Sequence, residues 1–164
     1  MEVAKWNVQW KVSKYEGDIN ACKTEAERQA FLKKPCQVVK GKGNCLLNTG
    51  INELWELVAG ASANHFDNTH ATIGVGNSTT AAAAAQTDLQ GASKTYKGME
   101  ATYPLHTTQA ITFKSVFGNA EANYAWNEWV VKQSTSSICL NRKVESMGTK
   151  ASGSWAIEVA ISLA

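Results

Sequence analysis

The first residues of the chain alternate between apolar and polar side chains. Trp6, Val8, Trp10 and Val12 share one face, and lysine, asparagine and glutamine occupy the positions between them. A period of two that includes tryptophans is typical of a half-buried β-strand. The same kind of pattern recurs in the second half of the chain and predicts five further strands, at residues 96–103, 109–117, 123–132, 138–144 and 154–163. The short polar or glycine-bearing segments between them favour an antiparallel sandwich or barrel.

Between residues 24 and 44 the pattern predicts a short helix followed by a basic loop. Thr24 and Glu27 have the spacing of a capping box, in which each side chain accepts a hydrogen bond from the other residue's backbone. Pro35 disfavours helical geometry at the residue before it, so the helix should end near residue 34. The lysine- and glycine-rich residues 38–44 are expected to form a loop.

A second helix is predicted where Ile51, Leu54, Trp55 and Val58 recur at i, i+3, i+4 and i+7. This spacing forms one apolar stripe, which we expect to pack against the core. Residues 71–76 then predict a short strand. The complete pattern predicts an α+β, predominantly β fold: an antiparallel β-sandwich, immunoglobulin-like or jelly-roll-like, with two short N-terminal helices.

The 164 residues, 44% of them hydrophobic, are expected to form a single domain spanning residues 1–164. Residues 1–43, with the first strand, the helix and the basic loop, form a candidate attachment arm, and residues 44–164 form a helix followed by the sandwich. The first fifty residues carry a charge of +4 and the remainder −2. The chain shows no apolar run long enough to span a membrane and no secretory signal, so a membrane partner is not expected.

The sequence motifs predict no catalytic site and no cofactor. His65, Asp67 and His70 form the one cluster of metal-ligand types; a solvated loop is favoured, and an ordered ion remains the alternative. Residues 74–79 begin like a dinucleotide-binding motif but lack its final glycine, so a turn at a strand end is expected. Scattered lysines neutralise few phosphates, which argues against nucleic acid as a partner. The four cysteines form no CxxC pair and are expected to be reduced thiols, with a disulfide among the first three left open.

Trp126 and Trp129 carry the sequence's own indication of assembly. They are three residues apart, so on one regular strand they must point to opposite faces of the sheet. One of them should therefore lie on the outer side, covered by a second layer or by a neighbouring subunit.

Four segments resemble a recurrent structural protein of tailed bacteriophages. They are residues 46–55 (LLNTGINELW), 73–80 (IGVGNSTT), 117–129 (FGNAEANYAWNEW) and 140–150 (LNRKVESMGTK). Members of this group are described as capsid decoration (cement) or tail-fibre-like proteins, and the resemblance covers roughly residues 44–164. It is carried by glycine, tryptophan and polar positions and includes no catalytic signature.

The resemblance implies a virion component without enzymatic activity, located on the capsid exterior and assembled in the host cytoplasm. Its partners would be the major capsid protein and further copies of itself, as a homotrimer. We expect Lys33, Lys34, Lys40 and Lys42 to contact the shell or a neighbouring subunit, because the N-terminal residues differ in charge from the rest. Trp129 is a further candidate contact, because one of the two tryptophans should lie on the outer side of its sheet.

Two alternatives remain open at this stage. One is a tail-fibre or collar component that binds host surface glycan, with Tyr103 or Trp129 stacking on sugar rings. The other is an enzyme acting on cell-wall glycan, which would need a pair of carboxylates. Glu121 and Glu128 are seven residues apart, a spacing that puts them on opposite faces if the strand is continuous.

Overall fold

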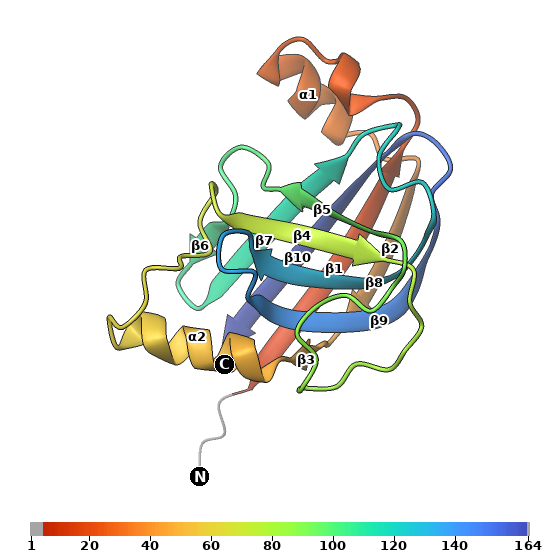
Figure 1. The fold of residues 1–164 in the computed structure, drawn as a ribbon. Helices are drawn as coiled ribbons and strands as arrows, with labels where there is room; N and C mark the ends of the chain where they lie inside the picture. Colours follow the sequence, from red (N-terminus) through yellow and green to blue (C-terminus); the bar gives the residue numbers. More distant parts are fainter. Residues whose placement is uncertain (1–4, 164) are drawn as a thin grey trace.

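The computed structural model describes residues 5–163 and consists of two five-stranded antiparallel sheets, with two α-helices (Figure 1). Sheet A contains, in spatial order, β2 (Gln37–Lys42), β1 (Trp6–Tyr15), β10 (Ser154–Leu163), β7 (Ala110–Phe117) and β6 (Leu105–Thr107). Sheet B contains β3 (Cys45–Leu46), β9 (Cys139–Thr149), β8 (Ala125–Gln133), β4 (Ala71–Gly76) and β5 (Lys94–Gly98). The predicted mostly antiparallel β fold with two helices is confirmed, and its two sheets form a β-sandwich.

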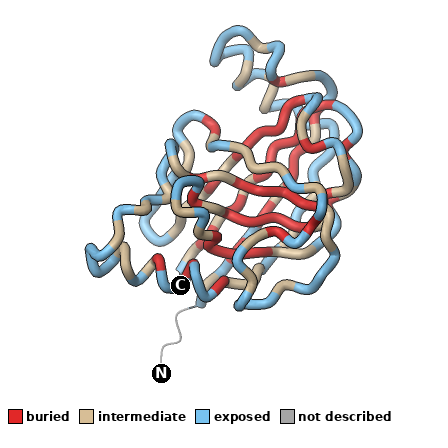
Figure 2. The backbone as a smooth tube through the Cα atoms, in the orientation of Figure 1, coloured by how far each residue is buried: buried red, intermediate tan, exposed pale blue. Residues whose placement is uncertain are grey.

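The core lies between the two sheets, where the buried strand segments are concentrated (Figure 2). Val8, Trp10 and Val12 of β1 point into it, as their alternation predicts. They meet side chains from sheet B such as Ile73 and Val131. Burial of these large apolar side chains, each worth about 1.5–3 kcal/mol, is the main stabilising term of the fold.

Residues 1–43 do not form a separate arm in the part that the structure describes. β1 lies between β2 and β10 in sheet A, with Trp10 opposite both Gly41 and Val159. The predicted basic loop is largely the edge strand β2. Gly41 makes this pairing feasible, because a Cβ there would overlap the indole ring of Trp10. The sandwich therefore begins at Trp6, and not after residue 44.

The expectation that Trp126 and Trp129 point to opposite faces is wrong. The pairing of β8 with β9 is irregular between Trp126 and Glu128, so the alternation of side chains is interrupted there. Both indoles point into the core, and each is 0% exposed. Trp126 packs edge-to-face against Phe117 and Trp155. The core thus takes up both rings without a second layer or a neighbouring subunit.

The helices lie at opposite ends of the sheets (Figure 1). Helix α1 (Glu25–Leu32) begins with the predicted capping box of Thr24 and Glu27. It follows a short 3-10 helix (Ile19–Ala21) and packs on the outer side of sheet A, where Phe31 lies against Tyr15 with ring centroids 5.2 Å apart.

Helix α2 (Asn48–Val58) packs against β9. A Cβ at Gly50 would overlap the backbone of Leu140, so a small residue is needed for this close approach. No helix within residues 5–163 is both long enough and apolar enough to cross a membrane.

Candidate functional site

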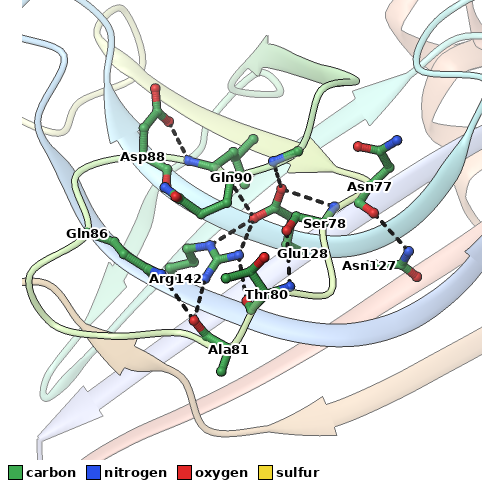
Figure 3. A network of polar contacts seen from close by, with 12 residues as sticks. Asn77, Ser78, Thr80, Ala81, Gln86, Asp88, Gln90, Asn127, Glu128 and Arg142 are labelled. Atoms are coloured by element: carbon green, nitrogen blue, oxygen red, sulfur yellow. Dashed lines mark hydrogen bonds and ion pairs between the residues drawn. The ribbon is translucent and has the colours of Figure 1, made fainter.

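A buried ion pair lies on the outer side of sheet B, beneath the loop of residues 77–93 (Figure 3). Glu128 of β8 and Arg142 of β9 are both 0% exposed, and Nε and Nη2 of Arg142 lie 2.8 and 2.7 Å from Oε2 of Glu128. The Glu128 carboxylate also accepts hydrogen bonds from three backbone N–H groups, those of Ser78 (3.3 Å), Gln90 (3.1 Å) and Gly91 (2.7 Å). One side chain thereby holds both ends of the loop.

The guanidinium of Arg142 holds the middle of the same loop. It donates to the backbone carbonyls of Thr80 (3.0 Å) and Ala81 (3.3 Å) and to Oε1 of Gln86 (2.8 Å). Both charges are thus surrounded by hydrogen-bond partners, which is the condition under which a buried ion pair is tolerated. Both carboxylate oxygens of Glu128 are thus bonded within this network.

The glycine motif of residues 74–76 belongs to this arrangement. Its residues 74–76 are the last three of β4, and residues 77–79 of the predicted turn follow where the strand ends. A Cβ at Gly76 would overlap the carboxylate of Glu128, and a Cβ at Gly74 would lie 2.6 Å from the Tyr96 ring. Both glycines make room for larger side chains that cross β4 on its outer side.

A second polar cluster lies beside the loop. Asp88 accepts a hydrogen bond from the hydroxyl of Tyr96 (2.6 Å) and from the ammonium of Lys132 (2.8 Å). The thiol of Cys139 is buried next to it, and this burial, together with the charge of Asp88, raises the pKa of the thiol to about 12. A thiol that stays protonated at neutral pH is a poor nucleophile.

The histidine cluster forms part of a turn. Asp67 accepts hydrogen bonds from the backbone of Thr69 and His70 and from the His70 ring, whose Nδ1 is 2.8 Å away. His65 takes no part in these bonds. In the described part of the chain no group of three or more histidine, cysteine, aspartate or glutamate residues is placed to hold a metal ion.

The predicted contact lysines lie in two places. Lys33 and Lys34 are exposed where α1 ends. Lys40 and Lys42 are exposed on β2, where Lys40 lies opposite Lys11 of β1. Because Trp10 and Val12 point inward, Lys11 and Lys40 point to the outer side of sheet A.

Lys114 of β7 and Glu158 of β10 lie on the same outer side of sheet A. Glu158 of β10 lies opposite both Lys11 and Lys114, and its carboxylate is 2.9 Å from the ammonium of Lys11 and 3.0 Å from that of Lys114. We define the basic face as the outer side of sheet A that carries Lys11, Lys40, Lys42, Lys114 and Glu158. Within residues 5–163, neither Lys40 nor Lys42 pairs with a carboxylate.

Trp129 must be withdrawn from the predicted contact residues, because its side chain lies in the core. The structure exposes a different tryptophan, Trp55 of α2, which is 68% exposed. Its neighbours along the helix, Ile51 and Val58, are 37% and 79% exposed, while Leu54 packs on the core. We name Ile51, Trp55 and Val58 the α2 stripe. The sequence identified its periodicity but not its exposure, since an apolar helix face does not by itself specify what covers it.

Comparison of the chain with protein-family models, curated proteins and solved structures found no match.

Proposed function

We propose that this protein is a non-enzymatic structural component of a tailed-bacteriophage virion. It would act as a capsid decoration protein, a homotrimer assembled in the host cytoplasm and attached to the major capsid protein on the capsid exterior. The observation that carries the proposal is the basic face, where Lys11 and Lys114 flank Glu158 and two further lysines lie beyond Lys11 on the edge strand β2. The immunoglobulin-like or jelly-roll-like type of the sandwich stays a prediction from the sequence.

The basic face suits attachment to an acidic protein surface. Lys40 and Lys42 are exposed and lie at the edge of sheet A, where a flat partner can reach them. Lys11 and Lys114 share one carboxylate, so the positive charge of the face is only partly neutralised. Complementary charge increases the rate of encounter and disfavours wrong partners.

The buried ionisable groups support a structural role. Glu128 and Arg142 satisfy each other and hold a loop, and Asp88 is bonded to Lys132 and Tyr96. In each case the charged atoms are occupied by bonds within the protein. Decoration requires a rigid body with binding surfaces, and these networks provide rigidity.

Such a protein would stabilise the capsid by thermodynamic linkage between its binding and the assembled state of the shell. A ligand that binds only the assembled shell stabilises that state by mass action. Each copy would contact neighbouring capsomers and thereby oppose their separation by the pressure of packaged DNA.

Co-sedimentation with capsids that lack the protein tests this function. Saturable binding and greater survival of the capsids on heating are expected for the native protein. Lys40→Glu should weaken binding, and Lys94→Glu, an exposed lysine on β5 of the other sheet, should not. Point variants are needed because removal of residues 1–43 would also remove β1 and β2 from sheet A. Absence of binding by the native protein would refute the proposal.

The second candidate function is a tail-fibre or collar component that binds host surface glycan. The exposed indole of Trp55 favours it, because a flat aromatic ring can stack on a sugar. Of the two platforms expected from the sequence, Trp129 is buried, and the ring of Tyr103 lies next to the ammonium of Lys114, 5.5 Å from its centroid. Adsorption to host cells without shell binding would support this candidate.

A further inference from the structure

We propose that the α2 stripe is the surface through which copies of this chain bind one another. The inference rests on the self-association included in the proposed function, and it does not depend on attachment to a shell. It assigns that contact to α2 at one end of the sandwich (Figure 1).

The spacing of the stripe fits pairing with its own copies. Ile51, Trp55 and Val58 are separated by four and then three residues, which is the alternation of a coiled-coil seam. When identical helices meet around a symmetry axis, such a seam places the side chains in layers. Around a threefold axis three Trp55 side chains share the middle layer, with an Ile51 layer on one side and a Val58 layer on the other.

The charges of α2 permit the approach of identical copies. The helix contains no lysine or arginine. Glu53 is buried and receives a hydrogen bond from the hydroxyl of Ser62, and Glu56 receives one from Asn52 at 2.7 Å. The three residues of the stripe carry no charge, and the half-buried carboxylate beside them, Glu56, is already bonded within the helix.

The helix is held firmly enough to present a fixed surface. The backbone N–H of Leu47 donates to the carbonyl of Leu140 (3.2 Å), and the hydroxyl of Thr49 donates to the carbonyl of Cys139 (3.4 Å). Gly50 brings the helix backbone against β9. A rigid surface loses little conformational entropy when it binds.

The exposed area sets the expected strength of association. The exposed fractions of the three side chains correspond to roughly 300–400 Å² of mostly apolar surface. A stable interface buries about 800 Å² on each partner. The stripe would therefore form the centre of an interface whose polar rim contributes the remaining area, and association should be reversible and dependent on concentration.

Other occupants fit the stripe less well. A sugar needs hydrogen-bonding groups beside the aromatic ring, and the polar residues next to Trp55, Asn52 and Glu56, are hydrogen-bonded to each other. A helix that lies on an anionic membrane carries lysine or arginine beside its apolar face, and α2 carries none. A second copy of an uncharged seam meets neither difficulty.

Light scattering coupled to gel filtration, over a wide range of protein concentration, tests the inference. Trp55→Gln is the disrupting variant, and Leu105→Gln, at an exposed apolar residue on β6, is the matched control. We expect trimers of the native protein and of the control. Trp55→Gln should weaken association by roughly tenfold or more, as expected when a tryptophan at the centre of an interface is removed. Because Trp55 is exposed in the single chain, the variant should fold normally, which circular dichroism checks.

Tryptophan fluorescence gives an independent readout. Trp55 is the exposed member of the six tryptophans, so quenching by acrylamide should fall as the native protein associates. Native protein that stays monomeric, or Trp55→Gln that associates like the control, overturns the inference. A dimer that Trp55→Gln abolishes supports the seam and overturns the trimer. Shell binding by monomers would overturn the seam and leave the proposed attachment intact, so the two failures are distinguishable.

Discussion

The outer sides of the two sheets are built differently. On sheet B, the loop of residues 77–93 covers the strands and is held by a fully buried ion pair, Glu128 and Arg142. On sheet A, α1 covers only one end, and the ion pairs of Glu158 with Lys11 and Lys114 are partly exposed. The same types of charged side chain thus stabilise the fold on one side and remain accessible to a partner on the other. Burial decides which of the two roles a charged pair can take.

The largest effect is expected from Arg142→Ala. It leaves the Glu128 carboxylate buried without its partner, and breaking a buried pair in this way costs about 3–5 kcal/mol. Lys11→Ala breaks a partly exposed pair on sheet A and should cost less than about 1 kcal/mol. Urea denaturation measures both values.

A control separates the lost charge partner from lost packing. The double variant Glu128→Leu with Arg142→Met removes both charges and should be more stable than Arg142→Ala alone. Protease should cut the loop of residues 77–93 faster in Arg142→Ala than in the native protein. Equal losses of stability for Arg142→Ala and Lys11→Ala would contradict the contrast between the two sides.

Apolar side chains of the loop that covers sheet B should contribute more to stability than those of α1, which covers sheet A. Leu89 of the loop is fully packed on Val130 and Cys139, so Leu89→Ala should cost about 2–4 kcal/mol. Phe31 of α1 is only partly buried against Tyr15, so Phe31→Ala should cost roughly 1–2 kcal/mol. Thermal unfolding gives the ranking. A larger loss for Phe31→Ala would show that α1 is the more important cover.

The smallest expected effect is on the stability of the fold at acidic pH, through Glu158. Burial raises the pKa of Glu158, but the hydrogen bond from Lys11 and the charge of Lys114 lower it more, so the net pKa lies below the ordinary value of 4.5. A carboxylate with a lowered pKa stabilises the fold above its unfolded pKa, and this contribution is lost as the pH falls through the folded pKa.

Glu158→Gln should therefore reduce the loss of stability below about pH 4.5, by less than about 1 kcal/mol. Denaturation at a series of pH values for the native protein and the variant measures the difference. An unchanged pH dependence would mean that other carboxylates account for the acid response, among which Asp88 also has a lowered pKa.

The sequence by itself determined the elements that depend on nearby residues. The alternation at residues 154–163 predicted β10 with its observed bounds, and the capping box of Thr24 and Glu27 marked the start of α1. Both signals act within a few residues: the strand period places side chains on two faces, and the cap closes hydrogen bonds within one turn.

Only the tertiary structure decided which surfaces are free. β2 became a strand because Gly41 accommodates Trp10, a residue of another strand. Trp129 turned inward because the pairing of β8 with β9 is irregular, and the stripe of Trp55 stayed outside because α2 packs through Gly50 and Leu54. Each outcome depends on strand register and on contacts between residues distant in sequence. Local periodicity specifies that a face is apolar, but only the assembled sheets determine what covers it.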